Sequence, residues 1–227
     1  ERNMANFTYS SVKSTTVDTG DGNDTVSINN SSTYGLYSST LKTGSGNDSV
    51  AIVSYNYGVY QSTINLGDGN DTLSARSTSS SDDYYEAEVD AGSGDDLIYV
   101  YSPKRSTFVG GAGKDTIVFE GKRSAWDLEF FYTNLGELDY ISTTDSNKVY
   151  GFEVFKFDDV TFDLTAVPVD ATGLSSLSGS APQLNSVVTP LIWDGLGFNR
   201  LTLSSFNGAT VDTGDGNDTV SINNSST

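Results

Sequence analysis

The side chains in this chain that are best suited to chemistry are aspartates that follow two closely spaced glycines. The frame x-Gly-x-Gly-x-Asp-x-apolar occurs six times, and its acid is always aspartate: Asp24, Asp48, Asp71, Asp96, Asp115 and Asp218. Glycines separated by one residue let the backbone take positive φ twice, which turns carbonyls inward beside the carboxylate. Carbonyl and carboxylate oxygens are the ligands that calcium accepts, in loose geometry. The frame therefore predicts a calcium-binding turn.

The composition also favours calcium binding and argues against several other functions. The chain has 12 basic and 30 acidic residues, a net charge of −18, and neither cysteine nor histidine. This charge argues against nucleic acid and anionic membranes as partners and favours cations. Disulfides, thiolate metal sites and the commonest general base are unavailable. The sequence has no HExxH or GxSxG motif and no apolar run of about 18 residues, so we expect neither an enzyme nor a membrane span.

The spacing of the frames predicts the elements that position them. The first five frames have their first glycine at 20, 44, 67, 92 and 111, in steps of 24, 23, 25 and 19 residues. Such a step suggests one solenoid coil per repeat. An apolar residue follows each aspartate by two places, and stacked coils would place these residues in one ladder: Val26, Val50, Leu73, Ile98 and Ile117. Each coil is expected to consist of a strand, the glycine turn, a second strand and a polar turn.

One turn provides about half of a calcium shell, so each ion would lie between two stacked coils. Glycine or Asx turns without metal are the alternative, but they do not require aspartate at one position six times. An EF-hand does not fit Asp68–Ser79, because Ser79 stands where its glutamate should be. A phosphate-binding loop does not fit either, since the turn is acidic and no helix is expected after it.

The frame resembles the repeats-in-toxin (RTX, hemolysin-type) nonapeptide GGxGxDxUx, whose copies form parallel β-rolls. The nonapeptide's first glycine is replaced by Thr19, Thr43, Leu66 and Ala91 and is kept as Gly110. The resemblance implies that carbonyls of Gly20 and Gly22 act with Asp24, and that the next coil adds carbonyls of Thr43 and Ser45 with Asp48. The remaining metal-site residues that it implies are Gly44, Gly46, Gly67, Gly69, Asp71, Gly92, Gly94, Asp96, Asp115, Gly214, Gly216 and Asp218. The family usually repeats every nine residues, whereas a step near 24 leaves room for a calcium turn on one side only. We expect one column of about four ions in the first array.

From Phe119 onward the pattern becomes aromatic and resembles the capping region that follows many arrays of the family. Phe119 to Trp126 and Phe152 to Thr161 are the matching segments. Asp158-Asp159 could be read as a catalytic pair, but its surroundings favour a turn. We predict an all-β chain: a right-handed parallel β-roll or β-solenoid of about five coils with a β-rich C-terminal cap, then the start of a second solenoid. The predicted parts are the calcium-binding array at 1–118, the cap at 119–164, a linker at 165–190 and the next array at 191–227.

The last stretch repeats the first. Residues 210–227 are identical over 18 residues to 16–33, at an offset of 194 residues. This indicates one unit of a large tandem repeat plus the beginning of the next, the alternative being an artificial duplication.

A structural calcium-binding segment of a large extracellular or cell-surface protein fits best, in a surface layer, filament or adhesin stalk, and the resemblance implies that this protein is bacterial. The likeness to RTX proteins implies type I secretion, and we expect neighbouring copies of the unit as partners. A calcium-dependent C-terminal module of a secreted enzyme is a second possibility. The third is a glycan-binding solenoid that uses aligned tyrosines such as Tyr37, Tyr60 and Tyr85, for which packing along one face is the simpler interpretation.

Overall fold

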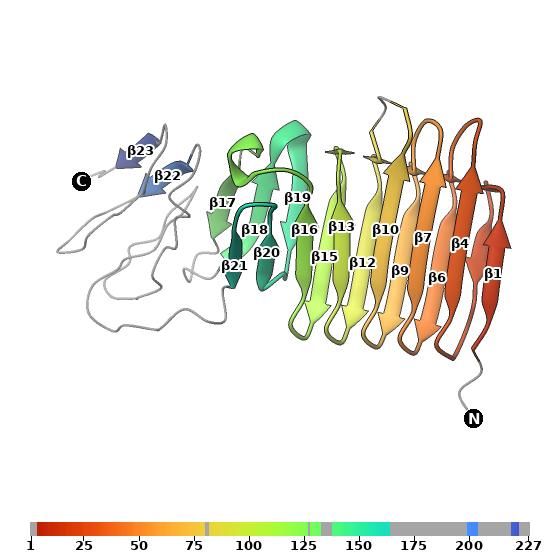
Figure 1. The fold of residues 1–227 in the computed structure, drawn as a ribbon. Helices are drawn as coiled ribbons and strands as arrows, with labels where there is room; N and C mark the ends of the chain where they lie inside the picture. The colour runs from red at the N-terminus through yellow and green to blue at the C-terminus, as the bar shows by residue number, and fades with distance from the viewer. Residues whose placement is uncertain are drawn as a thin grey trace. The chain divides into compact units, whose positions relative to one another are not determined.

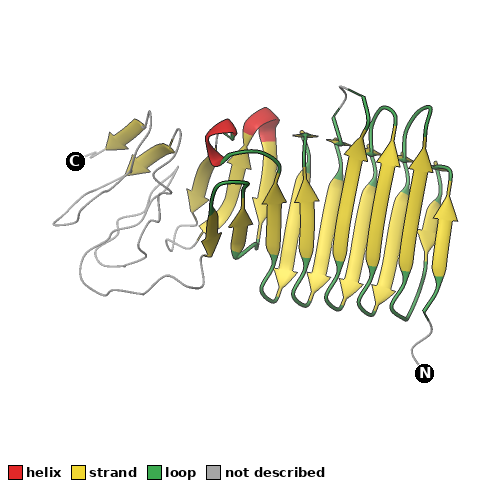
Figure 2. Ribbon diagram, in the orientation of Figure 1, coloured by secondary structure: helices red, strands yellow, loops and turns green. Residues whose placement is uncertain are grey.

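The computed structural model describes residues 4–79, 82–126, 128–132, 138–163, 199–203 and 219–222. Within these ranges the chain consists of strands and two short 3-10 helices, η1 (Arg123–Ala125) and η2 (Thr144–Ser146) (Figures 1 and 2). The chain divides into two compact units, of which the first contains residues 1–120 and 145–156 and the second 121–144 and 157–227. The linker predicted at 165–190 and three site residues, Gly214, Gly216 and Asp218, lie outside the described residues.

The first unit is a parallel β-solenoid whose coils contribute strands to three sheets (Figure 1). Sheet A contains β1 (Asn6–Tyr9), β4 (Thr25–Asn30), β7 (Ser49–Ser54), β10 (Thr72–Ser77), β13 (Leu97–Val100), β16 (Thr116–Phe119) and β20 (Val154–Lys156). Sheet B contains β2 (Val12–Lys13), β5 (Leu36–Tyr37), β8 (Val59–Tyr60), β11 (Tyr84–Tyr85) and β14 (Pro103–Lys104). Sheet C contains β3 (Thr16–Asp18), β6 (Thr40–Ser45), β9 (Thr63–Asp68), β12 (Glu88–Ser93), β15 (Thr107–Ala112) and β19 (Asn147–Tyr150).

The predicted apolar ladder is the core of sheet A. Its five residues face one another in register, Val26 opposite Val50, Val50 opposite Leu73, Leu73 opposite Ile98 and Ile98 opposite Ile117. None of the five is more than 1% exposed. Residues on either side of each face outward, as the period of two in a half-buried strand requires. The predicted β-solenoid of about five coils is confirmed.

Sheet B replaces the simple polar turn that the sequence suggested on the far side of each coil. Its strands are two residues long, which is too short for alternation to be recognised in the sequence. The inward residue of each is apolar, and Leu36, Val59 and Tyr84 are completely buried in one register. The outward tyrosines stack: ring centroids of Tyr37 and Tyr60 are 5.4 Å apart and those of Tyr60 and Tyr85 5.1 Å apart.

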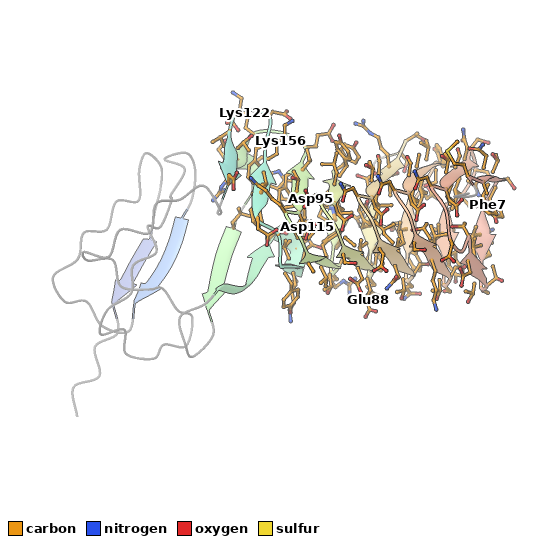
Figure 3. All side chains as sticks on the ribbon, turned by 90° about the horizontal axis from the view of Figure 1, so that it is seen from below. Phe7, Glu88, Asp95, Asp115, Lys122 and Lys156 are labelled. Carbon is orange, nitrogen blue, oxygen red and sulfur yellow. The ribbon has the colours of Figure 1, made fainter. Side chains whose placement is uncertain are left out.

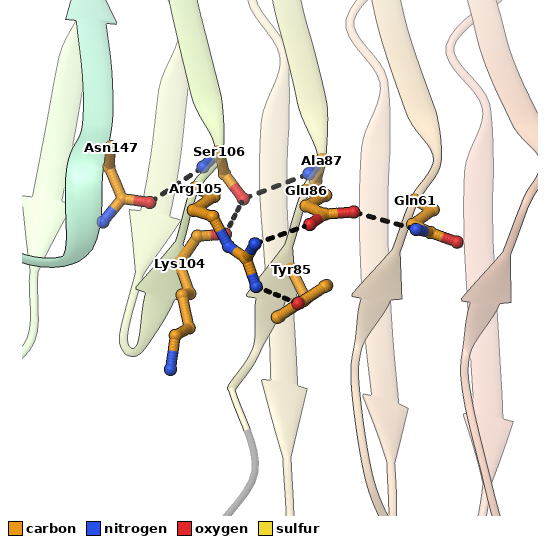
Figure 4. A network of polar contacts seen from close by, with 8 residues as sticks. All are labelled: Gln61, Tyr85, Glu86, Ala87, Lys104, Arg105, Ser106 and Asn147. Atoms are coloured by element: carbon orange, nitrogen blue, oxygen red, sulfur yellow. Dashed lines mark hydrogen bonds and ion pairs between the residues drawn. The ribbon is translucent and has the colours of Figure 1, made fainter.

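A ladder of side-chain hydrogen bonds follows sheet B. The Thr15 N–H donates to Ser39 Oγ (3.3 Å) and the Ser39 N–H donates to Ser62 Oγ (3.0 Å). Further along, the Ala87 N–H donates to Ser106 Oγ (3.1 Å) and the Ser106 N–H to Asn147 Oδ1 (2.9 Å) (Figure 4). Because each bond joins one coil to the next, the ladder continues into the segment 145–156, which returns to the solenoid as a sixth coil.

The second unit contains β17 (Leu128–Tyr132), β18 (Leu138–Thr143), β21 (Thr161–Asp163), β22 (Asn199–Leu203) and β23 (Thr219–Ile222). Strands β17 and β18 are antiparallel, and β22 pairs in parallel with both β17 and β23. Asp158 and Asp159 lie at a bend, where the Arg123 N–H donates to Asp159 Oδ1 at 2.9 Å. The turn interpretation of this pair therefore agrees with the structure.

Candidate metal site

All five glycine–aspartate turns lie at one edge of the solenoid, where each coil passes from sheet C to sheet A. Both glycines of every turn have positive φ, for example 98° at Gly44 and 133° at Gly46. A Cβ on Gly46 would lie closer than 3.0 Å to the Gly22 carbonyl oxygen of the preceding coil. Glycine is required here both for its backbone conformation and for the close approach of neighbouring turns.

The five aspartates form a continuous column, called here the aspartate column: Asp24, Asp48, Asp71, Asp96 and Asp115. Each backbone N–H donates to Oδ1 of the aspartate in the next coil: 2.6 Å from Asp24 to Asp48, 2.7 Å from Asp48 to Asp71, 2.8 Å from Asp71 to Asp96 and 2.9 Å from Asp96 to Asp115. Figure 3 labels Asp115 beside Asp95 of the neighbouring turn. The backbone thus fixes one oxygen of every carboxylate.

The other oxygen of every carboxylate in the column has no partner. Oδ2 of all five aspartates is buried without a hydrogen bond, and the five residues are between 0% and 3% exposed. A buried carboxylate oxygen without a donor costs free energy unless it is protonated or coordinated. The ion pairs of Arg76 with Glu120 and of Arg105 with Glu86 both lie outside the column.

The pKa values express this cost. Burial raises the pKa of Asp71 to about 6, of Asp96 to about 7 and of Asp115 to about 6, and it raises the pKa of Asp48 as well. The N–H donor from the preceding coil lowers each pKa in part, whereas neighbouring carboxylates raise it further. A divalent cation at this position would counteract these shifts, because its charge favours the ionised carboxylates.

A second ladder runs in the opposite direction, and sequence reasoning missed it. The residue just before each of the first four aspartates accepts a hydrogen bond from the next coil, as Asn23 Oδ1 does from the Asn47 N–H (2.8 Å) and Asn47 Oδ1 from the Asn70 N–H (2.9 Å). The repeated Asn-Asp pair was the available signal. Between the glycines, Ser45 donates to Asp21 and Ser93 to Asp68, both at 2.6 Å, so these outer carboxylates alternate with serines.

The carbonyls implied as ligands lie in the same turns. The Thr43 carbonyl accepts from the Thr19 hydroxyl (3.0 Å) and the Ser45 carbonyl from the Gly22 N–H (2.7 Å). The Gly20 carbonyl accepts from the Ser45 N–H at 3.3 Å. A carbonyl oxygen has two lone pairs, so these bonds leave an acceptor position on each. Gly67, Gly69, Gly92 and Gly94 take the same positive-φ conformation in later turns.

Comparison with known proteins agrees with this geometry. Residues 61–77, which contain Asp71 and its turn, match the model of the RTX calcium-binding nonapeptide repeat (4 copies). The match to RTX repeats lies in this segment, which contains one of the five turns. No curated protein and no solved structure matches it. Across the described part of the chain, none of the helices has the length and apolar character needed to cross a membrane.

The donors of the RTX turns fit calcium. Among the described residues, no three acidic side chains lie close enough together to hold one metal ion, so backbone carbonyls must contribute. Each junction between coils offers such carbonyls and two carboxylates, a set of oxygens without nitrogen or sulfur. Calcium accepts six to eight oxygens at irregular angles, which suits ligands that come from two separate turns. Calcium would also give the unpartnered Oδ2 atoms a positively charged partner.

Proposed function

We propose that this chain is a structural, calcium-rigidified segment of a large repetitive bacterial protein at the cell surface or outside the cell, without catalytic activity of its own. The observation that carries the proposal is the aspartate column, with five buried and unpartnered Oδ2 atoms at one edge of the solenoid. Calcium between the turns would join each coil to the next and thereby couple folding to binding. Extracellular calcium modules bind at about 10⁻⁴–10⁻³ M, which suits exported proteins.

The pairing of the last strands supports a tandem array. Leu201 lies opposite Val220 and Leu203 opposite Ile222. At an offset of 194 residues these pairs correspond to Phe7 opposite Val26 and Tyr9 opposite Ile28 in the first unit. The second copy therefore begins with the same register as the first. Its strand β22 also pairs in parallel with β17, which supports direct stacking of successive copies into a surface-layer, filament or adhesin stalk.

Two other functions remain as alternatives. A calcium-dependent C-terminal module of an enzyme that leaves by type I secretion would use the same turns. A glycan-binding solenoid is favoured by the half-buried tyrosines Tyr34, Tyr37, Tyr57, Tyr60 and Tyr85, whose rings stack along sheet B. Such rings can pack against sugars, and binding to immobilised glycans that is lost in Tyr60→Ala would support this function.

Calorimetric melting and circular dichroism with calcium and with EGTA test the calcium role. We expect cooperative melting and strand content in calcium, and a much lower melting temperature in EGTA. Identical curves would refute the proposal. The parent gene separates the structural segment from the enzyme module: consecutive copies at the 194-residue offset support the first, and an upstream catalytic domain the second.

A further inference from the structure

The fifth turn of the aspartate column faces a sixth turn that lacks the glycine–aspartate frame. The chain leaves the first unit after Glu120 and returns at Asp145. Strand β19 then pairs with β15, and β20 pairs with β16. The connection between them, Gly151 to Glu153, therefore occupies the place of a calcium turn.

Glu153 takes over the role of the aspartate in this sixth turn. The Asp115 N–H donates to Glu153 Oε2 at 2.8 Å, as each earlier aspartate N–H donates to the next carboxylate. The Asp115 carbonyl accepts from the N–H groups of Glu153 (3.2 Å) and Val154 (2.9 Å). The backbone thus holds Glu153 in register with the column.

The space between the fifth and sixth turns is lined by oxygens. A Cβ on Gly110 would lie closer than 3.0 Å to two of them, the Gly151 carbonyl oxygen and Asp115 Oδ2. Asp115 is completely buried, and its Oδ2 has no hydrogen-bond partner. The four earlier turns carry side chains at the position of Gly110, namely Thr19, Thr43, Leu66 and Ala91. Only in this turn is the position glycine, and here two oxygens lie close to the place that a Cβ would occupy.

We propose that Glu153, Asp115 and the Gly151 carbonyl form an additional calcium site, which closes the column at the junction with the returning segment. Four junctions join the five glycine–aspartate turns, and this site adds a fifth. The inference rests on the calcium role proposed above for the earlier turns. Its consequence is that calcium fastens residues 145–156 to the solenoid.

Native mass spectrometry of the full chain, titrated with calcium, tests the site. Glu153→Gln keeps an oxygen that can accept from the Asp115 N–H but removes the charge, and Glu120→Gln is the matched control at an exposed glutamate outside the turns. We expect Glu153→Gln to bind one ion fewer than the control at calcium concentrations that saturate the control. Equal numbers of ions would overturn the site. A wild-type chain that binds no calcium would instead refute the function proposed for the whole column.

A second variant keeps the test decisive if Glu153→Gln alters the fold. Gly110→Ala places a methyl group closer than 3.0 Å to the Gly151 carbonyl oxygen and to Asp115 Oδ2, so the returning turn must move away from Asp115 and the site opens. We expect this variant also to lose one ion while the strand signal in circular dichroism persists. Retention of every ion in Gly110→Ala would contradict the proposal.

Discussion

Replacing Asp71 with asparagine should change stability in opposite directions with and without calcium. Asp71 lies in the middle of the aspartate column, between Asp48 and Asp96, so it borders two junctions. Asparagine keeps an oxygen that can accept from the Asp48 N–H but removes the charge. A site saturated at 100 times its Kd contributes about 2.7 kcal/mol, so the weakening of two sites removes up to about 5 kcal/mol of calcium-dependent stability.

Without calcium, Asp71→Asn should increase the stability of the folded chain. The folded pKa of Asp71 is about 6, above the ordinary value of 3.8, so its ionised form destabilises the folded state at neutral pH. A shift of about two units corresponds to about 3 kcal/mol, of which asparagine recovers the part that is not offset by burying its own amide N–H2 without a partner. We therefore expect Asp71→Asn to be more stable than the wild type in EGTA and less stable in calcium.

Differential scanning calorimetry under both conditions measures the effect. The loss in calcium should lower the melting temperature by about 10–20 °C for a unit of this size. Asp90→Asn is the control, because Asp90 is an exposed aspartate on β12, outside the turns. A melting temperature lowered equally in EGTA and calcium, or a calcium response equal to that of the control, would refute the ligand role of Asp71.

Three further predictions concern pH, glycine and tyrosine. In EGTA, the free energy of unfolding should fall as pH rises from about 4 to about 7, because the pKa values of Asp71, Asp96 and Asp115 are higher in the folded chain than in the unfolded chain. In calcium the fall should become smaller, and what remains should come from Asp83, which is buried outside the turns and has its pKa raised to about 6. Urea titrations at several pH values measure both. Gly46→Ala should lower the melting temperature far more than Gly20→Ala, because a Cβ on Gly46 overlaps the Gly22 carbonyl. A Cβ on Gly20 meets nothing within 4 Å and costs only about 1–2 kcal/mol of backbone strain. Similar losses in the two variants would contradict the close stacking of turns. Tyr60→Ala should cost about 1–3 kcal/mol through its two stacked neighbours, without changing calcium affinity measured by calorimetric titration.

The sequence predicted the calcium edge because that edge has a strict frame. The glycine at the position of Gly69 and the aspartate at the position of Asp71 recur at fixed spacing in every turn. Few other residues can replace the glycine, because its φ is positive, or the aspartate, because it belongs to the aspartate column. The apolar ladder followed from the same frame, because Leu73 comes two residues after Asp71 and must point inward. Because the frame repeats, the local geometry of each turn could be predicted without knowing which residues of neighbouring coils it contacts.

The sixth coil could not be predicted in the same way. Glu153 follows Asp115 by 38 residues, and the intervening segment 121–144 belongs to the other compact unit. Glu153 also carries one methylene more than aspartate and lacks the paired glycines before it. Its position in the column depends on the pairing of β19 and β20 with distant strands, which no local pattern encodes.

The two edges of each coil are held by different chemistry. At the edge between sheets C and A, the contacts between turns place buried carboxylates on top of one another, so this edge is stable only when protons or cations balance the charge. At sheet B, neutral bonds such as that from the Ser39 N–H to Ser62 Oγ, and stacked rings such as Tyr37 on Tyr60, need no ion. In a solenoid with calcium turns on both sides, removal of calcium would destabilise both edges together. With the aspartate column confined to one edge, calcium controls the stability of that edge while the bonds and rings of sheet B keep the coils in register.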